Sequence, residues 1–182
     1  MQRRDFLAFS IAGVWVWNSP YVQAHTPFNQ WVVYRKKHLL IGCHKDDIET
    51  YRLAQELVDA LSSELPAAKA RIARAPTPRR LASLLATEQL DIALLNPDDA
   101  MLMAVGEAQF APYGSIDLST LFLLTDYVLV VRSDFPVKHA WLVAHALHEA
   151  ELGTSVDAAT KPPLPWHKGV SLYLDGKPLP SD

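Results

Sequence analysis

Four side chains that could do chemistry follow one another closely near the start of the sequence. Cys43, His44, Asp46 and Asp47 lie at or just after the end of the apolar run HLLIGC, residues 38–43. A thiolate and an imidazole are ligands that zinc and copper accept. The end of a buried strand is also where open α/β sheets bind their ligands. The sequence therefore offers Cys43 and His44 as a metal pair, and His44 also as a ligand-binding residue.

A simpler interpretation of the same segment is structural. Asp46 or Asp47 would cap the helix that the following residues predict, with its carboxylate near the positive end of that helix. Cys43 would be buried at the end of the strand. It is the only cysteine of the sequence and no CxxC or HxxxH pair accompanies it, and lone thiols are usually structural. The capping interpretation is favoured, and no cofactor is expected.

Histidines elsewhere give weaker metal signals. His145 and His148 are three residues apart in a predicted helix, with Glu149 beside them; this spacing allows chelation, but such pairs are more often solvated. His25 would begin the exported chain and could bind copper through its amine and imidazole. Nucleophilic catalysis has no support, because no GxSxG motif is present and no base is assigned to Cys43. An enzyme is therefore not expected.

Composition narrows the class of partner. The 182 residues are 49% hydrophobic and 20% charged, with a formal net charge of -3. These values are typical of an ordinary globular chain. They lack the basic excess of a nucleic-acid-binding protein, so nucleic acid is not expected as a partner.

The first 24 residues have the pattern of an export signal. They join a basic head to an apolar run, Phe6 to Trp17, that is too short to span a bilayer comfortably. RRDFL resembles the twin-arginine motif, and a general secretion signal is the alternative. We expect a periplasmic protein cleaved after Ala24, with a membrane involved only through an uncleaved signal.

The next part of the sequence alternates strand and helix patterns. Apolar runs at 38–43, 70–75 and 90–96 predict strands, and helical spacing predicts helices at 47–64 and 78–88. Such alternation over about 70 residues implies parallel pairing with right-handed crossovers. The expected fold class is α/β, with a three-layer open sheet.

Local signals place the helix starts. Thr77 is expected to cap the helix that begins with Pro78, and Pro97 is expected to begin another. Residues 118–134 form the most apolar stretch after the signal, and the polar pair at 125–126 predicts a long or interrupted strand there.

The end of the sequence is less regular. Residues 136–152 predict a helix, and GVSLYL, residues 169–174, fits a short helix or a strand equally well. The expected organisation is an N-terminal arm at 25–37, an α/β domain at 38–153, and a proline-rich tail at 154–182. That tail is expected to pack on the domain or on a partner.

Several of these segments together resemble one family. The run ARIARAPTPRRLASLLATEQLDIALLNPDDA, the strand YVLVVRSDFP and the ending LPWHKGVSLYLDG are similar to the TAXI solute-binding proteins of tripartite TRAP transporters. The resemblance covers most of residues 38–176 and implies the type II periplasmic-binding-protein fold. It also implies a ligand site that includes Thr50, Tyr51, Asn96 and His167 beside His44.

Two departures from that family affect the expected function. Family members hold their ligand between two lobes built from roughly twice this length, whereas this sequence supplies about one lobe. The family's Gly-rich loop is replaced here by CHKDD. Glycine lets backbone amides approach a carboxylate, whereas Asp46 and Asp47 repel one. Weak carboxylate binding is expected.

Two functions follow from these observations. The first is a non-catalytic, binding-protein-like domain that serves as an accessory or interaction subunit of a periplasmic complex, for example of a redox enzyme. The alternative is a TAXI-type solute receptor for small organic acids. The expected protein-partner surface is Trp31 and Tyr34 in the arm with Trp166 and Tyr173 in the tail, because aromatic residues are enriched at interfaces.

Overall fold

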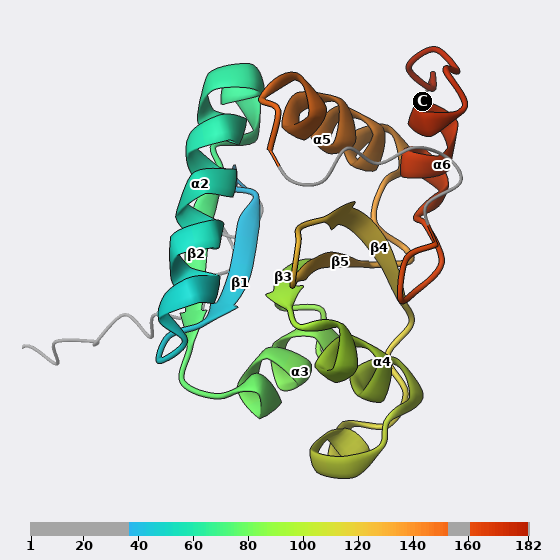
Figure 1. Cartoon of the computed structure of the whole chain (residues 1–182). Helices are drawn as coiled ribbons and strands as arrows, with labels where there is room; N and C mark the ends of the chain where they lie inside the picture. Colours follow the sequence, from blue (N-terminus) through green and yellow to red (C-terminus); the bar gives the residue numbers. More distant parts are fainter. Residues whose placement is uncertain (1–36, 153–160, 182) are drawn as a thin grey trace, which may run out of the picture.

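The computed structural model describes residues 37–152 and 161–181. They form an α/β domain around one open, mixed sheet with helices on both faces (Figure 1), so the expected fold class is confirmed. The predicted signal and the arm before Lys37 lie outside the described residues. In chain order the elements are β1 (Leu40–His44), α2 (Ile48–Glu64), the 3-10 helix η1 (Pro66–Ala68), β2 (Arg71–Ala75), α3 (Pro78–Ala86), β3 (Ile92–Leu95), α4 (Pro97–Val105), the 3-10 helix η2 (Ala108–Tyr113), β4 (Leu118–Leu123), β5 (Val128–Arg132), α5 (Val137–Glu149) and α6 (Lys168–Leu174).

The first three strands form the predicted parallel half of the sheet. The strand order is β2-β1-β3-β5-β4, and Ile41 of β1 lies opposite Ile72 on one side and Ile92 on the other. From β1 the chain runs to β2 on one side, and it then crosses back over β1 to form β3 on the other side. Because parallel crossovers are right-handed, this reversal puts α2 and α3 on opposite faces of the sheet.

The second half of the sheet is antiparallel, which corrects the prediction of one long or interrupted strand. The break falls where expected, but the chain reverses there and β5 pairs with both β3 and β4. Leu124 donates its backbone N–H to the carbonyl of Tyr127 at 3.0 Å, which closes the turn. The exposed pair Thr125 and Asp126 forms its tip. Two buried strands are therefore produced from one apolar stretch.

Successive side chains of each strand point to opposite faces of the sheet, and this alternation divides the core into two layers, one on each face. Ile41 and Cys43 of β1 face α2 and α5, while Leu40 and Gly42 face the side that carries α3. Figure 1 shows α5 and α6 on one side of the β4–β5 hairpin and α3 and α4 on the other. No described helix is long and apolar enough to cross a membrane.

The C-terminal segment is fixed to the free edge of β4 at a single residue. Thr120 donates its backbone N–H to Pro165 at 2.8 Å and its hydroxyl to the carbonyl of Leu164 at 2.8 Å, and it accepts from the N–H of His167 at 2.9 Å. Thr120 is fully buried. An unpaired edge strand would expose these backbone groups, so the segment from residue 164 to 167 covers part of that edge.

The segment GVSLYL is helical, as part of α6, and it approaches α5 closely at Gly169. A Cβ atom on Gly169 would lie 2.2 Å from the carbonyl oxygen of Val137 and 2.9 Å from the Cβ of Ala140. Only a residue without a side chain fits between the two helices at this point.

We therefore expect Gly169→Ala to destabilise the domain by about 1–3 kcal/mol, because a backbone carbonyl cannot move aside as a side chain can. Urea unfolding of the two proteins measures the difference. Lys168→Ala, at the exposed neighbouring position, is the control and should change stability by less than about 0.5 kcal/mol. Equal stability of the Gly169 variant and the wild type would contradict the close packing of α5 on α6.

Candidate functional site

The carboxyl ends of β1 and β3 mark the point at which the strand order reverses. Open α/β sheets bind their ligands outside this point, because the two following loops diverge to opposite faces and leave a crevice between them. In this structure the loops are the residues from His44 to Asp47 after β1, and Asn96 after β3. This edge is therefore the position at which a ligand site is expected.

The amides that a ligand would need at this edge are already bound. The Asp47 carboxylate accepts from the backbone N–H groups of Glu49 at 3.0 Å and Thr50 at 3.1 Å. Asn96 accepts from the N–H of Asp99 at 2.8 Å through its side-chain oxygen. Anions bind to helix N-terminal amides that are free. At the starts of α2 and α4, side chains of the protein itself already accept from the amides of Glu49, Thr50 and Asp99, so these amides are not free for an anion.

The third helix that begins at this edge is capped in the same manner. The Thr77 hydroxyl accepts from the N–H of Arg80 at 3.1 Å, and Pro78 occupies the first turn of α3. The predictions that Asp46 or Asp47 caps α2 and that Thr77 caps α3 are thus confirmed, with Asp47 as the residue in the first case.

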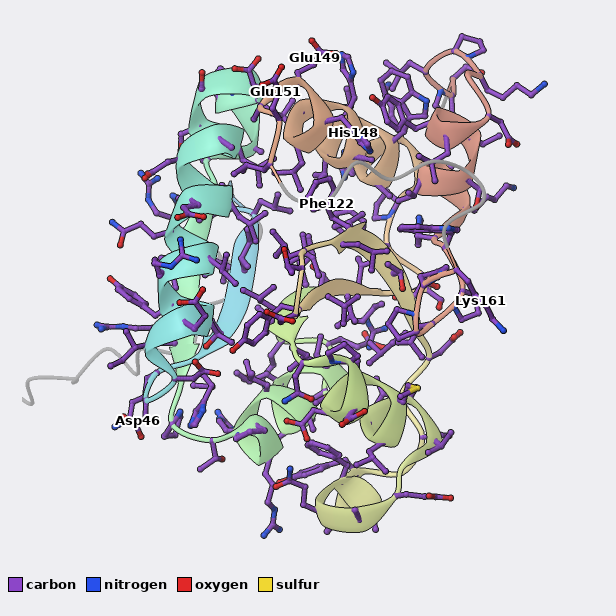
Figure 2. All side chains as sticks on the ribbon, viewed as in Figure 1. Asp46, Phe122, His148, Glu149, Glu151 and Lys161 are labelled. Carbon is purple, nitrogen blue, oxygen red and sulfur yellow. The ribbon has the colours of Figure 1, made fainter. Side chains whose placement is uncertain are left out.

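Charged side chains of both signs surround Asp47. Asp46 and Glu49 flank it, Lys45 lies 3.8 Å from Asp46, and Arg52 is paired with Glu49. Figure 2 shows Asp46 at the outer end of the loop before α2. Tyr127 donates its hydroxyl to the Asp47 carboxylate at 3.4 Å, and the pKa of that phenol is raised by burial and then by the Asp47 charge. The phenol therefore stays protonated at neutral pH and serves Asp47 as a donor.

Thr50 and Tyr51, implied by the family resemblance as ligand residues, have partners inside the domain. Thr50 is buried, and its hydroxyl lies 3.2 Å from the carbonyl of His44 and 3.0 Å from that of Asp47. The guanidinium of Arg74 lies 5.5 Å from the centre of the Tyr51 ring. Thr50 thus ties the start of α2 to the end of β1.

Cys43 and His44 are not brought together as a metal pair. Successive side chains of a strand point to opposite faces: Cys43 is fully buried in the core beneath α2, whereas the His44 ring lies 3.0 Å from the carbonyl of Pro76. Burial raises the pKa of the Cys43 thiol to about 11. The described residues contain no group of three or more His, Cys, Asp or Glu side chains placed to hold a metal ion.

His167 lies at the other end of the sheet from His44 and Asn96. It is buried against Phe135, which follows the end of β5, and its Nδ1 atom accepts from the N–H of Gly169 at 3.1 Å. Burial lowers the pKa of its imidazole, against the opposing effect of nearby backbone carbonyls. His167 is therefore a neutral helix cap.

The tail aromatics expected to bind a partner contact the domain itself. Trp166 packs against the core on the α2 side of the sheet. The Tyr173 ring lies 5.4 Å from Trp141, 5.7 Å from His145 and 5.2 Å from His148, centre to centre.

The predicted histidine pair is consequently part of an aromatic cluster. In Figure 2, Phe122 lies between β4 and α5 below His148, and their ring centres are 5.6 Å apart. The other two expected partner residues, Trp31 and Tyr34, lie outside the described residues.

A pocket at the opposite edge of the sheet was not predicted from the sequence. Its volume is about 480 Å³, and it lies between the chain that enters β1, the end of α2, the residues before β3 and the start of α5. Because four distant segments line it, no local pattern in the sequence could have indicated it.

Comparison with models of known protein families gave no match, and none of the curated proteins matches the chain. The structure itself shows an α/β domain with a five-stranded mixed sheet.

We expect Asp47→Ala to reduce the free energy of unfolding by about 1 kcal/mol, because two amides lose their acceptor. Thermal or urea unfolding measures this effect. Asp46→Ala is the matched control, since Asp46 is exposed and caps nothing, and it should be nearly neutral. Equal losses in the two variants would show that Asp47 is not the cap.

The buried His167 predicts a pH dependence of stability. Its pKa is lowered in the folded state, so below about pH 6.5 the unfolded chain binds a proton that the folded chain does not. Stability is therefore full above that pH and falls as the pH drops toward the folded pKa, by up to about 1.4 kcal/mol per pH unit for one proton.

His167→Asn separates this effect from the loss of the cap, because Asn caps helices well and does not titrate. Urea unfolding between about pH 7 and pH 5 should show a shallower pH dependence in this variant than in the wild type. His148, whose pKa is also lowered by burial, remains in both proteins. Identical pH dependences would mean that His167 does not titrate differently on folding.

Proposed function

We propose that this chain is an exported, non-catalytic, binding-protein-like domain that acts as an interaction or accessory subunit of a periplasmic protein complex. The observation that carries the proposal is the closure of the carboxyl edge. Asp47, Thr77 and Asn96 each accept from one or two amides of the helix that follows them, so fewer amides at that edge are left for a small carboxylate. The family resemblance of the sequence supplies the comparison with binding proteins.

Charge supports the same conclusion. Asp46, Asp47 and Glu49 surround the start of α2, and Asp98 and Asp99 lie in the first turn of α4. These acids stabilise the positive ends of their own helices. Asp46 is paired with Lys45 and Glu49 with Arg52, so Asp47, Asp98 and Asp99 are the acids that would repel the carboxylate of an organic acid.

Exposed apolar side chains provide the surface for a protein partner. Met101 and Val105 lie one turn apart on α4 and are 42% and 59% exposed, and Ile48 at the start of α2 is 83% exposed. Apolar side chains at the centre of an interface exclude water and carry much of its binding energy. Since Trp166 and Tyr173 are partly buried against the core, we place the partner on α4 and not on the tail.

The alternative function is a receptor for small organic acids of the TAXI type. It is favoured by the position of polar groups at the point where the strand order reverses: Asp47, Thr50, Asn96 and Tyr127 all lie near that edge. Ligand binding there would require Asp47 to leave the amides of Glu49 and Thr50.

Site-specific photo-crosslinking in the cells that export the protein tests the proposed function. A photoreactive residue at Met101 or Val105 should give one discrete adduct with another protein. The same residue at Ser63, which is exposed on α2, is the control and should give none. Met101→Ala with Val105→Ala should weaken the complex by roughly 1–3 kcal/mol. Absence of an adduct from both α4 positions would contradict an interaction through this helix.

A further inference from the structure

The two edges of the sheet differ in how they are covered. At one edge, β4 is joined by the segment 164–167 through Thr120. At the other edge, β2 pairs with β1 and with no other described strand (Figure 1). An edge strand presents N–H and C=O groups that can pair with a further strand. The described part of the sheet can therefore be extended at β2.

The backbone groups of β2 divide between its two sides. Arg71 donates its N–H to the carbonyl of Leu39 at 2.9 Å, and the carbonyl of Ala75 accepts from the first residue after β1 at 2.9 Å. Both residues thus direct their backbone groups toward β1. Because alternate residues of a strand direct these groups to opposite sides, Ile72 and Arg74 direct theirs outward.

The chain that forms this edge is basic. Residues 66–80 contain no acid and five cations, which are Lys69, Arg71, Arg74, Arg79 and Arg80. All five side chains are exposed. Within the described residues none of them forms an ion pair with a carboxylate. Their charge is therefore available to a partner.

The side of α2 next to these cations is uncharged. The ring of Tyr51 lies 5.5 Å from the guanidinium of Arg74, so Tyr51 marks the flank of α2 that faces this edge. Gln55, Val58 and Ser62 follow on the same flank at helical spacing. The helix on the other face, α3, contains no acid.

The acids of α2 and of the loop before it lie off that flank. They are Asp46, Asp47, Glu49, Glu56, Asp59 and Glu64. Asp46 is paired with Lys45, and Glu49 and Glu56 share Arg52. The outer side of β2 therefore presents positive charge together with outward backbone groups.

The spacing of two arginines selects the kind of strand that fits. Arg71 and Arg74 are three residues apart, so their side chains stand on opposite faces of β2. Opposite charges on adjacent strands attract and like charges repel. A second copy of this edge would bring its own arginines, whereas a strand with two acids three residues apart places one carboxylate beside each arginine.

We propose that an extended, acidic segment of a partner protein adds to β2 as a further strand. Its backbone pairs with Ile72 and Arg74, and its carboxylates lie beside Arg71 and Arg74. Main-chain hydrogen bonds give affinity in strand addition, and side chains give specificity. The proposal rests on the proposed function only for the existence of a protein partner. It concerns a different surface from α4, so a failure at either surface is distinguishable from a failure at the other.

Amide hydrogen exchange, followed by NMR in the exported chain, tests the proposal. The probe is a synthetic peptide of Val and Thr that carries two Glu three residues apart. Without peptide, the amides of Ile72 and Arg74 should exchange at least about tenfold faster than that of Arg71, which donates to Leu39. Saturating peptide should slow the exchange of Ile72 and Arg74 by at least about tenfold.

Two controls separate backbone pairing from charge. The same peptide with N-methylated central residues keeps its charge but cannot donate, so it should give no protection. Arg71→Gln with Arg74→Gln should weaken peptide binding by about three- to tenfold. Lys168→Gln with Lys177→Gln, at two exposed positions of the tail, removes the same charge and should leave binding unchanged.

Four results would overturn the proposal. Slow exchange of Ile72 and Arg74 without peptide would show that the chain's own residues cover the edge, and slowing that grows with protein concentration would show that a second copy does. Equal binding of the N-methylated peptide, or of a peptide with Lys in place of Glu, would exclude the acidic strand. Binding to anionic lipid vesicles without binding to the peptide would assign the cations to a membrane surface.

Discussion

The hydrogen bonds from Glu49 and Thr50 to the Asp47 carboxylate are the interaction on which the carboxyl edge of the sheet depends. They start α2 at a fixed residue, and the Thr50 hydroxyl then joins that start to the end of β1. Tyr127 links the same carboxylate to the β4–β5 hairpin. Asp47 and Thr50 together thus connect β1, α2 and the β4–β5 hairpin, and Asp47 does so by using amides at the edge where such sheets bind ligands. The structural role of Asp47 and the loss of an anion site are two results of the same contacts.

The tail has a comparable role at the other end of the domain. Thr120 holds the segment before α6 through three hydrogen bonds, and His167 then caps that helix while Gly169 lets it approach α5. The Tyr173 ring consequently contacts α5, and Trp166 is partly buried against the core. Exposed large apolar side chains remain at Ile48, at Leu179 and, one turn apart, at Met101 and Val105 of α4; the pair on α4 is the reason why the proposed partner surface differs from the one that the sequence suggested.

Local signals in the sequence were sufficient for the helices and the parallel strands. Asp47 and Thr77 act on amides two or three residues away, so their roles depend on little beyond their own segments. The hairpin between β4 and β5 was missed because its strands pair with β3 and with each other, and that choice depends on distant residues. The ligand role of His167 was implied only by the family resemblance and stays a prediction; its burial against Phe135 and its bond to Thr120 depend on distant residues that no local pattern indicates. Adjacent residues can also mislead: Cys43 and His44 are neighbours in sequence but face opposite sides of a strand.

We infer that the protein's own side chains occupy the amides that an anion would use at the carboxyl edge of the sheet. The most direct test follows the backbone amide resonances of Glu49, Thr50 and Asp99 by NMR while a small dicarboxylate is added to the exported chain. These resonances should stay in place at millimolar ligand, because Asp47 and Asn96 already occupy the amides. Saturable shifts of these amides at micromolar ligand would contradict it and would favour the receptor function.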